Sequence, residues 1–342
     1  MKQCRATSGT RGKRMNRYTC LVAVVVMACG APSGSDGGTD AGVDAGVKST
    51  LKAGFNARPN GWPGDGGVMI GAALYDGVVY AGTASQVLSL SLSEEQWQPV
   101  ALTLETDEVF TSIKRLDTTI VVTTAAPSGG SLYLKPAGGE FAKATNAPSK
   151  KMWSVVKKGS EFLLATSGGL FAANDLNGMW VKRTRIEAGT PFSGKVTRLV
   201  AGAGQLRMFA SGDKAQSTGG LYVSDDTGVN WAASTVKGNV LALDADGTTT
   251  LVETSVDGQR RSDNYGNTFK ALTVGAGVSA FSIANGTTWA ATDAGLKTSA
   301  DLGVTWSDDA QANVPTTGLR GLFNSGSLLV VDTEAGPTLA TP

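Results

Sequence analysis

Short apolar runs, and not long amphipathic segments, dominate the chain after residue 50. Runs such as Phe162–Ala165 and Leu328–Val331 are bounded by glycine-rich turns. Segments of this length between such turns are typical of buried β-strands, and no sustained 3.6-residue periodicity is present. The pattern predicts an all-β domain over residues 51–342.

An aromatic residue recurs at near-constant intervals in this domain. The positions are Trp97, Phe141, Trp180, Trp231, Phe269 and Trp306, separated by 44, 39, 51, 38 and 37 residues. One four-stranded blade of a β-propeller takes about 40–50 residues, so the spacing predicts one blade per interval. The longest interval contains an insertion, Ser211–Gln216.

Three of these aromatics end the same eight-residue motif, Ser-x-Asp-x-Gly-x-Thr-Trp in its fullest form. Its copies contribute Ser224, Asp226, Gly228 and Trp231, then Ser262, Asn264, Gly266 and Phe269, then Ser299, Asp301, Gly303 and Trp306. Ser and Asp oxygens accept hydrogen bonds from nearby backbone N–H groups, and Gly tolerates a positive φ. We interpret the motif as a structural clasp, because a catalytic acid is needed once and not in every blade.

The remaining aromatics follow partial copies of the motif. Asp175 and Asn177 precede Trp180, and Gly138 precedes Phe141. Asn is the next best residue after Gly at positive φ, so Asn177 is expected to take that conformation.

A seventh unit begins at Leu319 and ends one strand short at Thr338–Ala340. Phe55–Trp62 lies about one unit before Trp97, so we expect it to supply the missing strand and close the ring. The prediction is therefore a seven-bladed β-propeller, with six or eight blades left open.

The N-terminus has the pattern of an export signal. A basic region without acidic residues is followed by an apolar run, Tyr18–Ala28, too short to span a bilayer. It ends Val26-Met27-Ala28-Cys29, which resembles a bacterial lipobox. The resemblance implies that residues 1–28 are a lipoprotein signal peptide and that Cys29 is acylated. A plain secretory signal or an uncleaved anchor are the alternatives, and Met15 could replace Met1 as the start.

Residues 29–50 are rich in Gly, Asp and Ala and predict a flexible tether between membrane and domain. Without residues 1–28 the chain has 24 basic and 29 acidic residues, a formal charge of −5. A nucleic-acid partner is disfavoured by this balance, whereas an acyl anchor at Cys29 fits it. We expect the protein in the bacterial cell envelope, on the outer membrane or cell surface.

Histidine is absent, and the three cysteines all lie in the first 29 residues. Histidine-based catalysis and histidine-ligated metals are excluded, so no metal, cofactor or catalytic residue is assigned.

The eight-residue motif resembles the Asp-box of the BNR, sialidase-like and sortilin-like repeat families. The resemblance implies a clasp between the third and fourth strand of each blade, and ligand binding on the other face. Segments expected there include the acidic loop Leu104–Glu108. The candidate binding residues are Lys150, Lys151, Trp153, Arg183, Arg185, Asp213 and Lys214.

Three function classes stay open beside this resemblance. Sialidases need an arginine triad and a Tyr–Glu nucleophile pair, and the expected Arg-Ile-Pro motif is missing here. We therefore expect a non-catalytic platform that binds a protein or a glycan. A sialidase-like glycoside hydrolase is the alternative, and a structural envelope protein without a specific ligand is a third possibility.

Overall fold

The computed structural model describes residues 51–63, 67–183, 185–186, 190–191, 195–202, 206–210, 220–224, 228–284 and 286–341. All regular structure in these ranges is β, which confirms the all-β fold class. No helix capable of crossing a membrane occurs in this part of the chain. The signal peptide, Cys29 and the tether lie outside it.

Six four-stranded antiparallel sheets each use four consecutive strands. Sheet 1 contains β2 (Gly71–Tyr75), β3 (Val78–Gly82), β4 (Val87–Ser91) and β5 (Gln98–Pro99). Sheet 2 contains β6 (Val109–Leu116), β7 (Thr119–Ala125), β8 (Leu132–Pro136) and β9 (Ala142–Lys143). Sheet 3 contains β10 (Met152–Lys158), β11 (Glu161–Thr166), β12 (Gly169–Ala173) and β13 (Val181–Arg183).

The chain continues in the same order after a small hairpin of β14 (Arg185–Ile186) and β15 (Thr190–Pro191). Sheet 4 contains β16 (Val196–Ala201), β17 (Leu206–Ala210), β18 (Gly220–Ser224) and β19 (Ala232–Lys237). Sheet 5 contains β20 (Val240–Asp246), β21 (Thr249–Thr254), β22 (Gly258–Ser262) and β23 (Lys270–Ala271). Sheet 6 contains β24 (Ala280–Ala284), β25 (Thr287–Thr292), β26 (Gly295–Ser299) and β27 (Ser307–Asp308).

Sheet 7 joins the two ends of the domain. It contains β28 (Leu319–Ser325), β29 (Leu328–Thr333), β30 (Gly336–Ala340) and, as its fourth strand, β1 (Asn56–Ala57). Asn56 pairs with Leu339, and Ala57 pairs with Thr338. The N-terminal segment thus supplies the strand that the last repeat lacks, as its sequence predicts.

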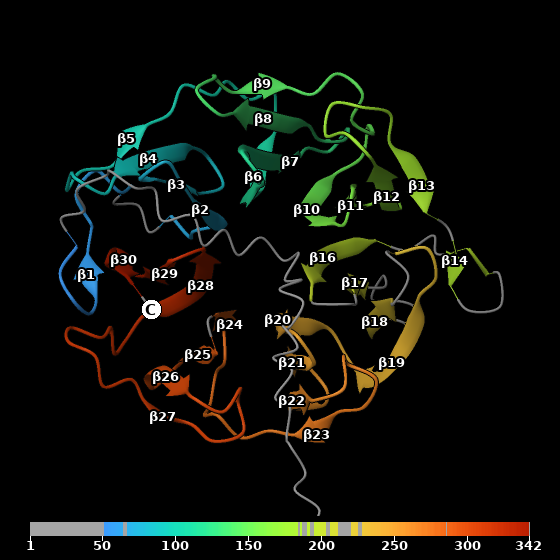
Figure 1. Ribbon diagram of the computed structural model, residues 1–342. Helices are drawn as coiled ribbons and strands as arrows, with labels where there is room; N and C mark the ends of the chain where they lie inside the picture. The colour runs from blue at the N-terminus through green and yellow to red at the C-terminus, as the bar shows by residue number, and fades with distance from the viewer. Residues whose placement is uncertain are drawn as a thin grey trace, which may run out of the picture. The chain divides into compact units, whose positions relative to one another are not determined.

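The seven sheets are arranged radially around one axis (Figure 1). The first strand of each sheet contacts the first strand of the next, and β28 contacts β2, which closes the cycle. This is the architecture of a β-propeller, in which ring closure leaves only short outer edges.

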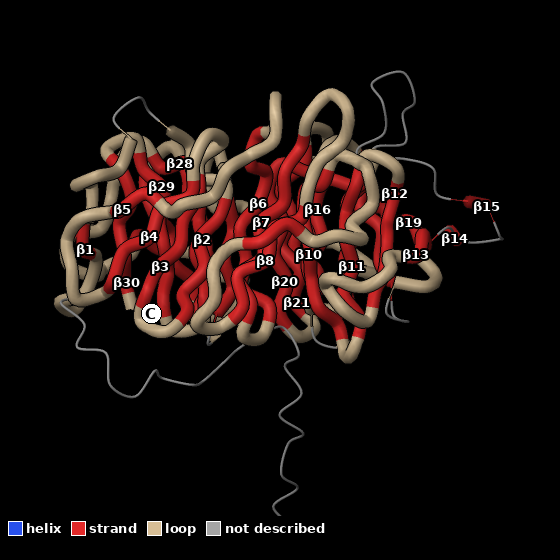
Figure 2. The backbone as a smooth tube through the Cα atoms, turned by 90° about the horizontal axis from the view of Figure 1, so that it is seen from above, coloured by secondary structure: helices blue, strands red, loops and turns tan. Residues whose placement is uncertain are grey.

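The ring has two loop-bearing faces (Figure 2). Because strands alternate in direction, first turns and third turns of every sheet lie on one face, which we call the clasp face. Second turns and the connections between sheets lie on the other, which we call the opposite face.

Apolar side chains fill the wedges between neighbouring sheets. Trp97 is fully buried in a cluster that joins Leu88 and Leu90 of sheet 1 to Leu328 and Leu339 of sheet 7. Its ring meets Trp62 edge-on at 5.2 Å. Each sheet is therefore buried on both faces, which explains why strands read as continuous apolar runs.

A threonine closes the second turn of several sheets. The hydroxyls of Thr166, Thr292 and Thr333 donate to the carbonyls of Gly169, Gly295 and Gly336 at 2.7–2.8 Å. This second repeated turn stabilises the opposite face.

Candidate binding surface

The loop between β26 and β27 is closed by its own side chains. Ser299 Oγ accepts from Gly303 N at 2.8 Å and donates to Asp301 Oδ1 at 2.7 Å. The Asp301 carboxylate also accepts from the N–H groups of Val304 and Thr305. Hydrogen bonds, led by that from Thr305 N–H, hold the pKa of Asp301 well below its ordinary range.

The glycine of this loop is required for two reasons. Gly303 has a φ of 86°. A Cβ built there would lie 3.0 Å from Leu251 Cδ2 of sheet 5. A side chain at this position would therefore be strained by its backbone and by its neighbour.

The loops of sheets 5 and 4 repeat the arrangement. Ser262 Oγ accepts from Gly266 N at 2.8 Å, and Asn264 Oδ1 accepts from Thr268 N at 2.9 Å. Ser224 Oγ accepts from Gly228 N at 2.9 Å. Asp226 lies outside the described residues.

The aromatic of each clasp packs toward the preceding sheet. Trp231 and Leu163 of sheet 3 share one core cluster, and Trp306 and Leu251 share another. Trp231 Nε1 and Trp306 Nε1 donate to the carbonyls of Gly228 and Gly303 within their own loops. The motif thus joins turn closure to packing between sheets.

The corresponding loop of sheet 3 is built differently. Asn177 is not among the non-glycine residues with positive φ, so the sequence-based expectation for it is wrong. Its side-chain oxygen instead accepts from Thr145 N of the preceding sheet's connection at 2.9 Å. Ala173 replaces the clasp serine, so the hydroxyl that would fix the turn is missing. Trp180 Nε1 has no hydrogen-bond partner among the described residues.

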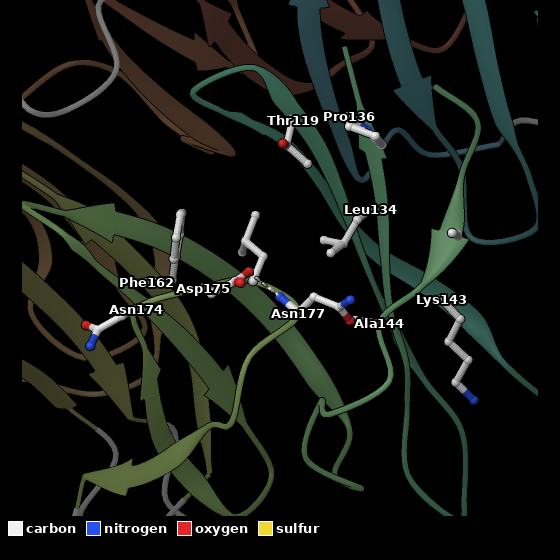
Figure 3. Close-up of a pocket in the computed structure, with 11 residues that line it drawn as sticks. Thr119, Leu134, Pro136, Lys143, Ala144, Phe162, Asn174, Asp175 and Asn177 are labelled. Carbon is white, nitrogen blue, oxygen red and sulfur yellow. Dashed lines mark hydrogen bonds between the residues drawn. The ribbon is translucent and has the colours of Figure 1, made fainter. Parts of the chain in front are cut away.

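A pocket of about 510 Å³ lies beside this loop on the clasp face (Figure 3). Its apolar walls include Leu134 of sheet 2 and Phe162 and Leu176 of sheet 3. Asn174, Asp175 and Asn177 contribute polar groups. The pocket does not contain any of the candidate binding residues.

Three of those residues gather on the opposite face. Trp153 lies in β10, where the register with β11 shifts, and its ring is half-buried. The Nζ atom of Lys195 lies 4.5 Å from the centre of this ring, within range of a cation–π interaction. Lys151 precedes β10, and the exposed Lys150 extends over Gly168 in the second turn of sheet 3. We call Lys150, Lys151, Trp153 and Lys195 the basic–aromatic surface.

The other candidates do not join this surface. Arg183 forms an ion pair with Glu161, which begins β11 next to the clasp face. The side chain of Arg185 and both Asp213 and Lys214 lie outside the described residues. Lys195 is not among the candidate binding residues of the sequence analysis. Its contact with Trp153 joins two neighbouring sheets, and no motif in the sequence indicates such a contact.

Glu108 and Tyr133 form a buried Tyr–Glu pair of the kind that a sialidase would need. Tyr133 Oη donates to Glu108 Oε2 at 2.9 Å, and Ser131 Oγ donates to Oε1 at 2.5 Å. Burial raises the pKa of Glu108, but these hydrogen bonds outweigh it and lower the pKa overall. Burial, together with the bond to Glu108, raises the pKa of Tyr133 to about 12.

This pair is buried, and Tyr133 belongs to the apolar cluster that joins sheets 1 and 2. The phenol is held protonated, and the carboxylate is held ionised. Glu108, the last residue of the acidic loop Leu104–Glu108, is therefore buried and anchors the connection to sheet 2. Among the residues that the structure describes, no cluster of three acidic or thiol ligands is suited to a metal ion.

Charged side chains also occur on the inner strands around the axis. Lys114 belongs to β6, Arg198 to β16 and Asp244 to β20, and the three interact electrostatically. Burial raises the pKa of Asp244 to about 6 and lowers that of Lys114 to about 8. Lys114 and Asp244 are partly buried, whereas Arg198 is exposed to solvent.

No protein-family model matches the chain, and no curated protein sequence matches it. Solved structures match it only as folds. YCF48 bound to D1 peptide has a TM-score of 0.61 at 14% identity, covering 86% of this chain and 99% of YCF48. Virginiamycin B lyase from Staphylococcus aureus has a TM-score of 0.57 at 10% identity, covering 84% and 98%.

PorZ, a surface component of the type-IX secretion system of Porphyromonas gingivalis, has a TM-score of 0.57 at 14% identity. The match covers 79% of this chain and 36% of PorZ. These similarities support a β-propeller. At such identities a peptide-binding protein and an enzyme share the fold equally, so the fold does not select a function.

Proposed function

We propose that this chain is a lipid-anchored, seven-bladed propeller of a bacterial cell envelope that binds a protein through its opposite face. The basic–aromatic surface carries the proposal, because a half-buried tryptophan beside several lysines is the composition of a binding anchor. The peptide complex of YCF48 supports a protein ligand by analogy. We also infer that the clasps make the chain a divergent Asp-box propeller.

Trp153→Ala is expected to abolish partner binding without lowering the melting temperature by more than about 2 °C, because the ring is only half-buried. Binding is measured by retention of envelope proteins on immobilised full-length chain. Met179→Ala is the matched control, since Met179 is 80% exposed in the third-turn loop of the same sheet, on the clasp face.

Retention by Met179→Ala and loss by Trp153→Ala would support the proposal. Equal retention by both variants would refute this face as the binding surface. A glycan array probed with the same variants separates the two ligand classes, because a Trp153-dependent glycan signal would replace the protein by a sugar.

The hydrolase alternative has less support. Three of its candidate guanidinium groups form ion pairs in different sheets: Arg183 with Glu161, Arg261 with Asp263, and Arg320 with Asp332. They are therefore engaged at separate places and do not form a triad. The two residues of the Tyr133–Glu108 pair are buried, 4% and 9% exposed.

Cys29→Ser is expected to move the protein from the membrane fraction to the soluble fraction, because thioether attachment of lipid requires the thiol. Fractionation followed by immunoblotting measures the change, with Cys20→Ser as the control. Membrane retention of Cys29→Ser would exclude acylation at this residue as the anchor.

A further inference from the structure

The charged residues of the inner strands are not fully paired. No ion pair within 4 Å joins Lys114 or Arg198 to a carboxylate among the described residues. Lys114 Nζ donates to Ser154 Oγ at the long distance of 3.4 Å. The Arg198 side chain has no hydrogen bond to another described residue. Both cations thus retain capacity for an anionic partner.

Asp244 does not meet that need. Its Oδ2 accepts from Ile283 N at 2.7 Å, and its Oδ1 accepts from Ala245 N at 2.9 Å. Each carboxylate oxygen is therefore already engaged by the backbone. Asp246, two residues further along β20, is exposed at the clasp-face end of the strand. Two cations, Lys114 and Arg198, therefore share one carboxylate, that of Asp244, as their electrostatic partner.

Lys114 is partly buried among the inner strands, and low-dielectric walls focus the field of neighbouring cations and so strengthen their attraction for anions. Solvent reaches Arg198, so an anion can approach it. Arg198 lies three residues after Lys195 and directly after the register shift of β16. The shift in β10 contains Trp153, so Arg198 lies on the inner strand next to the basic–aromatic surface.

We propose that Lys114 and Arg198 form a subsite for a carboxylate group of an acidic peptide segment that approaches from the opposite face. This rests on the proposed function and specifies its ligand chemistry. A guanidinium binds planar oxyanions through two N–H groups. A surplus of one positive charge matches a singly charged carboxylate better than a doubly charged phosphate.

The test uses the full-length chain and a fluorescent peptide, Gly-Glu-Glu-Gly, with Gly-Gln-Gln-Gly as the control, both with amidated C-termini so that the control carries no carboxylate. Anisotropy is expected to show binding of the Glu peptide only, weakening as salt rises. Inorganic phosphate serves as a competitor. Absence of Glu-peptide binding would overturn the proposal, and displacement by phosphate at lower concentration than by acetate would overturn the carboxylate assignment.

Arg198→Gln and Lys114→Gln should each weaken binding at least about fivefold, because each removes one charge-assisted hydrogen bond. Asp244→Asn should change affinity in the other direction, strengthening binding by about threefold, because it removes a competing negative charge. Lys182→Gln is the control, since it removes the same charge from an exposed site on β13. Melting curves verify that each variant is folded.

Equal affinities for Arg198→Gln, Lys114→Gln and Lys182→Gln would refute the subsite. That result would leave the proposed function standing if Trp153→Ala still lost the protein partner. Loss of peptide binding in Arg198→Gln and Lys114→Gln, together with retention of the protein partner by Trp153→Ala, would support the subsite and refute the basic–aromatic surface.

Discussion

Trp97→Ala is expected to lower the free energy of unfolding by about 3–5 kcal/mol, the usual cost of removing a large buried aromatic. Trp97 is 1% exposed and packs between sheets 1 and 7. Its Nε1 donates to the carbonyl of Arg58, directly after β1. The substitution therefore removes core volume and the contact that holds the ring-closing strand.

Urea unfolding measures the loss, and hydrogen exchange locates it. Trp231→Ala is the matched control, because Trp231 is 2% exposed but packs between sheets 3 and 4, away from the closing pair. Both variants should lose stability, but only Trp97→Ala should lose protection of the β1–β30 pair selectively. Equal opening of that pair in both variants would contradict a specific role for Trp97 in closure.

Ser299→Ala should destabilise the fold by about 1–3 kcal/mol, the cost of leaving a buried hydrogen-bonding group without its partner. Ser299 is buried, and its hydroxyl fixes both Gly303 N and Asp301. The exposed Ser307 in β27 provides the control through Ser307→Ala, expected to be neutral. Equal stability of the two variants would refute the clasp interpretation.

The same clasp predicts a pH dependence. The pKa of Asp301 is lowered in the folded state from its ordinary value of 3.8. Its contribution is therefore complete above pH 3.8 and is lost as pH falls toward the folded-state pKa. Asp301→Asn should lose this pH dependence between pH 5 and pH 2, which urea unfolding at several pH values would show.

The fold was predictable because the repeat imposes it. The regular spacing of Trp231, Phe269 and Trp306, 38 and 37 residues apart, fixes one sheet per interval, and the motif marks the third turn in these three sheets. The missing strand of the last repeat also had to come from the first residues, since an open ring would expose a sheet edge.

Local departures from the repeat were not predictable. Asn177 was expected to take the positive φ of the clasp glycine. Because Ala173 replaces the clasp serine, no hydroxyl is present to fix a left-handed turn there. The amide of Asn177 then bonds to Thr145 of the preceding sheet. The result depends on the distance between two sheets, which one motif cannot reveal.

The charged cluster of Lys114, Arg198 and Asp244 was not predicted from the sequence for a related reason. Lys114 stands beside Arg115 in β6, and Asp244 stands close to Asp246 in β20, so each alone is an ordinary polar position. They meet Arg198 only because the ring brings β6, β16 and β20 around one axis. A charged residue within an inner-strand pattern is the signal that could have identified them.

The pairing of β1 with β30 has a consequence for biogenesis. A nascent chain that has emerged only as far as Ser325 already contains all strands of six sheets. Its strand β1 still has no partner, because β30 has not been made. The core cluster around Leu88 and Leu90 is then incomplete, because it lacks Leu328 and Leu339. Closure therefore depends on β29 and β30, and products truncated before these strands should be recognised by chaperones and proteases as incompletely folded.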